Sequence, residues 1–175
     1  MSASPKLPLG LMALLLAMDQ GSKAWVRAAV PIGAKPVPLI PNFIDLTHVS
    51  NAGVSFSFLA DLPGAIRAPL LAGVSLVAAA LIGAYWVRHR TRLPALAEAA
   101  FVLILPGAVG NLIDRAWFGA VTDFFHFRIF DASLFVNNAA DIFISVGVGC
   151  YLLAALLDKQ EPPAGAPGGS KQRAR

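Results

Sequence analysis

Residues 68–87 carry no charged side chain and are bounded by Arg67 and Arg88. This run has the length and composition of a transmembrane helix, which needs about 20 mostly apolar residues to cross the hydrocarbon core of a bilayer. That core offers no water to the backbone N–H and C=O groups, so the segment must satisfy them internally as a helix. A chain that contains such a segment is predicted to fold in a membrane.

The composition supports the same conclusion for the rest of the chain. Of its residues, 57% are hydrophobic and 14% are charged, whereas soluble domains are about 45–50% apolar and about 25% charged. Three further apolar stretches are interpreted as helices, at about 7–26, 93–113 and 139–157. Together with 68–87 they make four. We therefore predict an all-α integral membrane protein with four transmembrane helices, forming one domain over residues 1–160.

The first of these stretches has two interpretations. Its uninterrupted apolar run, Leu7–Met18, is short enough to be the core of a cleavable signal peptide. It is followed by Asp19 and Lys23, whose i, i+4 spacing allows them to pair on one face of a helix. Because that pairing lowers the free energy of two charges inside a bilayer, we interpret residues 7–26 as a retained helix.

The basic residues predict the orientation. Lys6 precedes the first helix, Arg88, Arg90 and Arg92 lie between the second and third, and further Lys and Arg residues follow the fourth. Short cytoplasmic loops carry an excess of Lys and Arg, so both termini are predicted to be cytoplasmic. No aromatic stacking residues are interleaved with these basic residues, so no nucleic-acid partner is expected.

The segments outside the helices differ in character. The outer loop, 27–67, contains possible short strands at 43–46 and 54–59, which predict a small extracytoplasmic β-element between the first two helices. Residues 161–175 are rich in Pro, Gly and Ala and are predicted to be a disordered cytoplasmic tail.

Polar side chains gather at one depth of the predicted bundle. The first and third helices run outward and the fourth begins on the outer side, so polar residues near those ends converge on the outer leaflet. Unpaired charge at that depth costs several kcal/mol, which makes the cluster a functional hypothesis. Its members are Asp19, Lys23, Asn111, Asp114, Arg115, Asp123, Asn138 and Asp141.

A pair of carboxyl groups is the chemistry that this cluster supplies best. Asp123 and Asp141 are separated by the aromatic stretch 124–130, which suits the membrane interface and can lie along the surface to bring the acids together. Two such acids a few ångströms apart share one proton, which is the arrangement of aspartic proteases.

Other roles stay open from the residues alone. Asp114 and Arg115 can form a structural or lipid-headgroup pair, and Asp123 can cap an interfacial helix. The Asp19–Lys23 pair can brace two helices, and carboxylates in membranes also line proton and ion pathways.

Metal and thiol chemistry are not expected. His48, His89 and His126 are scattered without the spacing of metal ligands. Cys150 is the single cysteine and lies in an apolar run, which favours a helix-packing role. We therefore expect neither a metal nor a cofactor.

Four short motifs, in this order along the chain, resemble those of a known family. They are Asp19-Gln20 with Lys23, the segment NAGVSFSF at 51–58, the segment GNLIDR at 110–115 followed by Gly119, Val121 and Asp123-Phe124, and the segment NAAD at 138–141. Over about residues 7–157 the sequence is similar to lipoprotein signal peptidase, also called signal peptidase II, a family of bacterial membrane aspartic proteases.

This resemblance implies an activity and a location. It implies an endopeptidase of the bacterial cytoplasmic (inner) membrane, with its site near the outer leaflet. The implied substrates are diacylglyceryl-modified prolipoproteins, which are cut on the N-terminal side of the lipidated cysteine. The partners are then these precursors and membrane lipids, and we expect a monomer.

The resemblance also implies roles for individual residues. Asp123 and Asp141 would be the catalytic pair, and the outer loop would form a β-cradle over the site. The residues implied to hold the substrate are Asn51, Gly53, Asn111, Arg115 and Asn138. Asp19 and Lys23 would form a supporting polar pair, and Asp114 would serve structural or headgroup pairing.

Two motifs depart from the family pattern. Asn137 stands where the family usually has Phe, and Ile142 stands where a small polar residue usually follows the Asp. Val54 and Ser55 stand where small residues such as Ala are usual. These departures affect the predicted pocket shape and inhibitor fit but not the two acids.

The alternative function is a carboxylate-lined transporter or assembly factor without catalytic activity.

Overall fold

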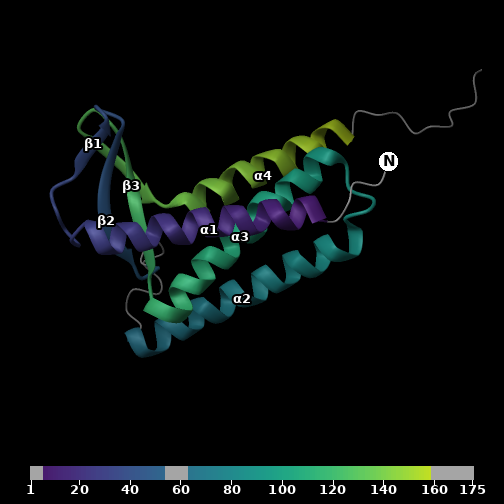
Figure 1. Ribbon diagram of the computed structural model, residues 1–175, viewed down its shortest axis with the longest axis horizontal. Helices are drawn as coiled ribbons and strands as arrows, with labels where there is room; N and C mark the ends of the chain where they lie inside the picture. The colour runs from purple at the N-terminus through teal and green to yellow at the C-terminus, as the bar shows by residue number, and fades with distance from the viewer. Residues whose placement is uncertain (1–5, 54–62, 159–175) are drawn as a thin grey trace, which may run out of the picture.

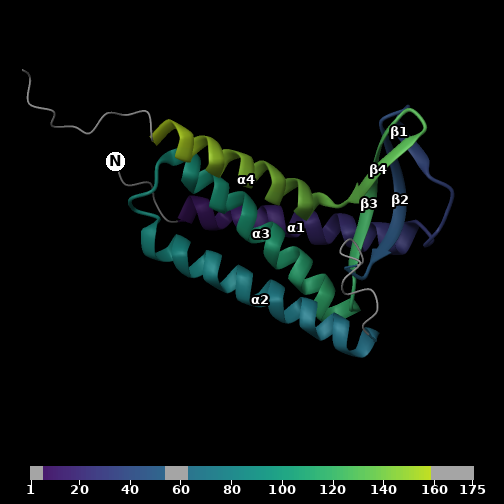
Figure 2. The same ribbon diagram turned by 180° about the vertical axis from the view of Figure 1, so that it is seen from behind.

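The computed structural model describes residues 6–53 and 63–158, which form four helices and four strands. The helices are α1 (Lys6–Ala29), α2 (Gly64–His89), α3 (Ala95–Phe118) and α4 (Ala139–Asp158). They run lengthwise beside one another, and a small sheet lies at one end of the bundle (Figure 1 and Figure 2). α1 and α3 run toward the sheet, whereas α2 and α4 run away from it.

Three of the described helices are long and apolar enough to cross a membrane, namely α2, α3 and α4. We predicted four, so the prediction is confirmed only for these three. α1 has the length of a span, but it carries Asp19, Lys23 and Arg27 in its second half. These charges lower the hydropathy of α1; Asp19 and Lys23 pair with each other, and the three residues also have partners on α3, α4 and β3.

α3 is the central helix, because it packs against α4, α2 and α1. Its buried Phe101 and Leu105 form the hydrophobic core together with Trp86 of α2. The outward face of α2 exposes apolar side chains such as Val77 and Leu81. An exposed apolar face of this kind is suited to lipid, since lipid tails are as apolar as Leu.

Glycines allow α3 and α4 to approach closely. A Cβ atom on Gly107 would lie 2.6 Å from the backbone oxygen of Ala140, and one on Gly147 would lie 2.7 Å from Ile104 Cγ1. Nearly one turn further along α3, a Cβ atom on Gly110 would overlap the carboxylate of Asp19. Small residues at such contacts are typical of membrane helices.

The sheet corrects the predicted β-element. Its four antiparallel strands, in spatial order, are β1 (Val37–Ile40), β2 (Ile44–Asn51), β3 (Val121–Ile129) and β4 (Ala132–Asn137). The loop between α1 and α2 therefore supplies only half of the sheet, and the segment between α3 and α4 supplies the other half. The possible strand at 43–46 overlaps β2, while the one at 54–59 lies outside the described residues.

Most of the aromatic stretch 124–130 forms a strand, because 124–129 belong to β3; its placement along the membrane surface stays a prediction. Its aromatic side chains also favour a strand, and pairing with β2 and β4 satisfies its backbone. Asp123 accordingly lies within a strand and does not cap a helix.

The register between β2 and β3 positions the polar site. Val49 lies opposite Asp123, and Asn51 lies opposite Val121. Asn51 and Asp123 are therefore diagonal neighbours on one face of the sheet, within reach of each other. α3 ends just before β3 at Gly119, whose φ of 72° is the left-handed conformation that often terminates a helix.

Candidate active site

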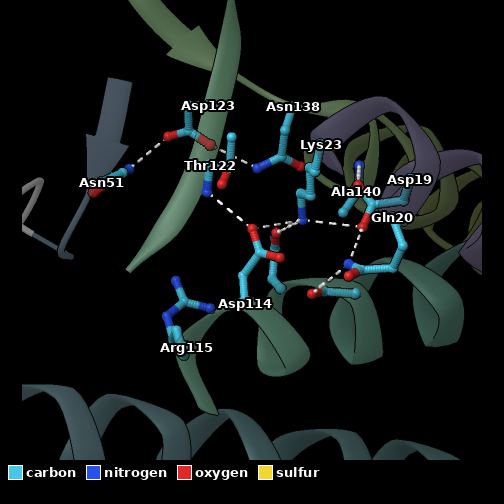
Figure 3. A network of polar contacts seen from close by, with 12 residues as sticks. Asp19, Gln20, Lys23, Asn51, Asp114, Arg115, Thr122, Asp123, Asn138 and Ala140 are labelled. Carbon is cyan, nitrogen blue, oxygen red and sulfur yellow. Dashed lines mark hydrogen bonds and ion pairs between the residues drawn. The ribbon is translucent and has the colours of Figure 1, made fainter. Parts of the chain in front are cut away.

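Asp123 lies on β3 and is almost completely buried, with 1% of its surface exposed. Its two carboxylate oxygens accept hydrogen bonds from two amide side chains (Figure 3). Asn51 Nδ2 donates to Oδ2 at 2.8 Å, and Asn138 Nδ2 donates to Oδ1 at 2.6 Å. The carboxyl group of Asp123 is therefore held between β2 and the start of α4.

Asp141 lies in the first turn of α4 and forms a reciprocal cap with Asn138. The backbone N–H of Asp141 donates to Asn138 Oδ1 at 3.1 Å, and that of Asn138 donates to Asp141 Oδ2 at 3.3 Å. This is the geometry of a capping box, and a carboxylate at a helix N-terminus is favoured by the helix dipole. Asn111 Nδ2 on α3 donates to Asp141 Oδ1 at 2.8 Å.

Asn138 thus contacts both acids, which are eighteen positions apart in the sequence. It is fully buried, and its amide donates to Asp123 while its carbonyl oxygen accepts from Asp141. The two carboxyl groups are consequently neighbours on either side of one asparagine.

Burial raises the pKa of Asp123 to about 6, and the neighbouring Asp141 carboxylate acts in the same direction. The amide donors of Asn51 and Asn138, together with Lys23, lower the pKa and partly offset the burial. Asp123 therefore takes up a proton at a pH well above that of an ordinary aspartate, which suits a group that must donate a proton near neutral pH.

Lys23 is fully buried and lies between three partners supplied by two helices. Its Nζ is 3.0 Å from Asp19 Oδ2, 3.6 Å from Asp114 Oδ2 and 2.9 Å from Asn111 Oδ1. Because the Asn111 oxygen accepts from Lys23, its amide nitrogen is left to donate to Asp141. Lys23 therefore orients the Asn111 side chain that contacts Asp141.

Asp19 links α1 to α4. Its Oδ1 accepts from the backbone N–H of Ala140 at 3.0 Å, and Gln20 Nε2 donates to its Oδ2 at 3.0 Å. The same Gln20 amide donates to the backbone oxygen of Gly110 at 3.1 Å. The predicted Asp19–Lys23 pair is thus part of a network that joins α1, α3 and α4.

Asp114 is also fully buried, and its ion-pair partners are Lys23 and Arg27. Its Oδ2 accepts from the backbone N–H of Thr122 at 2.9 Å, which ties the end of α3 to β3. The structure places no exposed surface on Asp114 for a lipid headgroup. Arg115 points elsewhere and donates to Ser75 Oγ on α2 at 3.3 Å.

Gly53 follows β2 with a φ of 83°, a conformation that glycine adopts readily. Its N–H donates to Asn51 Oδ1 at 2.9 Å, which leaves the Asn51 amide nitrogen directed at Asp123. A Cβ atom at Gly53 would overlap the Leu71 side chain of α2. Gly53 therefore contributes to the orientation of Asn51.

Three site residues were not predicted from the sequence. Arg27 contacts Asp114 and donates to Thr122 Oγ1 at 2.9 Å, and its spacing of four residues from Lys23 was the signal that could have indicated it. Thr122 also donates its backbone N–H to Asp114, and Ser75 accepts from Arg115 across two helices. Both contacts depend on the tertiary structure, so neither residue has a signal of its own in the sequence. Within 6–53 and 63–158, no group of three His, Cys, Asp or Glu residues is arranged to hold a metal.

The fold and the site together define a helical membrane protein in which a buried aspartate, Asp123, and a half-buried one, Asp141, are linked through Asn138. The model of one family, described as Signal peptidase (SPase) II, matches residues 11–157. The chain belongs to the signal peptidase II family. The family prediction made from the four motifs is thereby confirmed, together with the prediction that the protein is a peptidase.

Several relatives cover most of the chain. A lipoprotein signal peptidase of Gloeobacter violaceus is 38% identical over 160 residues, covering 91% of this chain and 87% of the relative. One of Bartonella henselae is 39% identical over 153 residues, covering 85% and 87%. A solved bacterial membrane enzyme has the same fold, with a TM-score of 0.77 at 23% identity, over 88% of this chain and 95% of that one.

Proposed function

We propose that this protein removes the signal peptides of lipoprotein precursors, with Asp123 and Asp141 as its catalytic pair. Membership of the signal peptidase II family and relatives named lipoprotein signal peptidase support the activity. The observation that carries the chemistry is Asn138, whose side-chain amide donates to the Asp123 carboxylate while its backbone N–H donates to the Asp141 carboxylate. The proposed substrates are precursors with a diacylglyceryl-modified cysteine, cut on its N-terminal side.

The two acids have different environments, and this favours different roles. Asp123, with a pKa of about 6, is the proposed acid that donates a proton to the scissile carbonyl oxygen. Asp141 is the proposed base that takes a proton from water as the water oxygen attacks the carbonyl carbon. The tetrahedral intermediate collapses when Asp141 gives the proton that it took from water to the leaving amide nitrogen and a hydroxyl proton returns to Asp123, so no covalent enzyme intermediate forms.

The asparagines orient the acids in this proposal, while Arg115 is left for the substrate. Asn51, Asn111 and Asn138 each donate a side-chain amide N–H to one of the carboxylates. Arg115 is half-buried beside this group, and a guanidinium offers five N–H donors, of which one reaches Ser75. It is suited to bind carbonyl or ester oxygens of the lipidated peptide.

For the membrane arrangement, we propose that α1 also crosses the bilayer, with both termini cytoplasmic. Asp19 and Lys23 are fully buried against the bundle, whereas Leu14, Met18 and Trp25 face outward. The charges of α1 would then be shielded from lipid, as intramembrane charges require. The tail at 161–175 lies outside the described residues and stays a prediction, as does the domain boundary at 160.

The decisive experiment is cleavage of a lipidated prolipoprotein in detergent by Asp123→Asn, Asp141→Asn and the double variant. Each single change should lower turnover by at least about 10³-fold, and the double variant should be scarcely worse, because the acids act as one unit. Asp131→Asn, at an exposed turn between β3 and β4, is the matched control and should keep full activity.

Folding must be checked, because both oxygens of Asp123 accept from amide donors. In Asp123→Asn the new amide nitrogen would face one of those donors. That donor would lose its acceptor, which lowers the stability of the fold by about 1–3 kcal/mol. Thermal melting of each variant separates this effect from lost chemistry. Substantial turnover by a folded single variant would contradict the proposed pair.

A transporter or assembly factor is not favoured, because the chain belongs to a peptidase family.

A further inference from the structure

An apolar groove runs along the bundle between α2 and α4, with α3 as its floor. Both α2 and α4 pack against α3, but they make no extensive contact with each other in the described part of the chain. A hollow of about 380 Å³ lies in this groove. Its lining includes Ile82 and Tyr85 of α2, Phe101 and Ile104 of α3, and Tyr151 and Leu152 of α4.

The hollow lies on the same helix faces as the active site. On α4, Leu152 is eleven positions after Asp141, which corresponds to three turns of one face. On α3, Ile104 is eleven positions before Arg115, again three turns away. On α2, Ile82 is seven positions, or two turns, beyond the Ser75 that Arg115 contacts. The groove therefore leads from Asp141 and Arg115 to the hollow, about 16 Å away from Asp141 along α4.

The character of the groove changes along its length. No charged residue lines the hollow. Beyond it, a second hollow of about 180 Å³ shares Tyr151 and reaches Asp158 at the far end of α4. From the acids outward the lining is polar and then apolar, and the far end of the bundle carries Asp158 of α4 as well as the basic residues Arg88, Arg90 and Arg92. A signal peptide read backward from its cleavage site begins with an apolar run, which matches the apolar lining of the hollow.

We propose that this groove binds the apolar helix of the signal peptide, and that the aromatic hollow seats one of its large side chains. The inference rests on the proposed function. A distance of about 16 Å is spanned by about eleven helical residues, or by about seven if the residues next to the cut are extended. The seated side chain therefore lies about seven to eleven positions before the scissile bond. Packing against ring faces supplies the preference, since lipid competes equally for apolar surface.

The test uses two matched substitutions on α4. Leu152→Trp fills the hollow, while Leu153→Trp alters a neighbouring side chain that lines neither hollow; the two leucines are 58% and 50% exposed. Each variant is assayed with a lipidated prolipoprotein and with a lipopeptide that keeps only about five residues before the cut. Leu152→Trp should lower kcat/KM for the long substrate about tenfold more than for the short one. Leu153→Trp should affect both substrates alike.

Crosslinking tests the same inference without turnover. A photoreactive leucine is placed at each position from six to twelve before the cut, and the substrate is mixed with the Asp141→Asn variant. Crosslinks confined to positions about seven to eleven, and mapped to peptides that contain Phe101 or Leu152, would support the groove.

Two results would overturn the inference. One is that Leu152→Trp and Leu153→Trp lower kcat/KM for the long substrate, relative to the short one, by the same factor. The other is labelling of the hollow by a photoreactive phospholipid that excess substrate fails to displace. The occupant would then be an acyl chain, with its headgroup near the arginines that follow α2. If no variant or parent cleaves either substrate while the crosslinks form as expected, the proposed function fails and the groove stands.

Discussion

At the scale of single residues, the site depends on asparagines whose two ends have different partners. The oxygen of Asn51 accepts from Gly53, that of Asn111 from Lys23 and that of Asn138 from Asp141. Each oxygen is therefore occupied, and each amide nitrogen is directed at a carboxylate. This arrangement holds both acids in place before any substrate arrives, and it fixes the environment in which they ionise.

The raised pKa of Asp123 predicts the pH dependence of cleavage. The group is protonated below about pH 6 and loses its proton as the pH rises through that value. If Asp123 is the acid, kcat/KM should be high below about pH 6 and fall about tenfold per pH unit well above it. The measurement is kcat/KM between pH 5 and 9 with one lipidated substrate in detergent.

The control for that profile is thermal melting of the parent over the same pH range, which detects unfolding. A rate that stays level up to pH 9 in folded protein would show that protonated Asp123 is not required.

Lys23 predicts a large effect on stability. Replacing it by methionine removes the cation between Asp19 and Asp114 and leaves two fully buried carboxylates without their shared partner. Breaking a buried pair in this way costs about 3–5 kcal/mol. Lys23→Met should therefore melt far below the parent, whereas Lys35→Met, at an exposed position, should change stability by less than about 0.5 kcal/mol. Similar melting temperatures for the two variants would contradict this role of Lys23.

At the scale of elements, the contact between α3 and α4 positions Asn111 against Asp141. Asn111 comes from α3, while Asn138 and Asp141 come from the start of α4. Gly107 and Gly147 bring these helices together, because any side chain there would meet the opposite helix. The distance between the helices therefore determines whether Asn111 can reach Asp141.

Two glycines of α4 provide a matched test. Gly147→Ala would place its Cβ 2.7 Å from Ile104 Cγ1 and 2.9 Å from the backbone oxygen of Ala100, whereas Gly149→Ala would meet nothing within 4 Å. Gly147→Ala should lower stability by about 1–3 kcal/mol through overpacking. Gly149→Ala should be neutral or slightly stabilising, because alanine favours the helix. Thermal melting in one detergent compares them, and equal melting points would show that the helices separate without strain.

At the scale of the whole molecule, the bundle and the sheet predict a topology. The hairpin tips at Asn42 and Phe130 join through a hydrogen bond, and they lie at the end of the bundle where α1 ends and α4 begins. If α1 crosses the membrane with its N-terminus inside, this sheet lies outside the cytoplasm.

Reporter insertions test that topology. An enzyme that is active only outside the cytoplasm should be active when inserted at Asn42 and inactive when fused after Asp158. The positive-inside pattern of Arg88, Arg90 and Arg92 is the physical basis of this prediction. The control is a reporter that is active only inside the cytoplasm. At the same two sites it should give the opposite result. Activity of the first reporter after Asp158 would contradict the orientation.

The sequence by itself determined the helices and the identity of the family. Uncharged runs such as 68–87 are local signals, because the cost of exposing backbone groups to lipid acts on each segment separately. The polar cluster was also predictable, since all eight of its members lie in or beside the observed network.

Only the tertiary structure decided how these parts meet. That β2 pairs with β3, that Asn138 contacts both acids and that Asp114 pairs with Lys23 and Arg27 depend on segments far apart in the chain. The same is true of the groove between α2 and α4. Hydropathy and periodicity describe how one segment responds to its solvent, whereas strand register and ion-pair choice follow from which surfaces pack together.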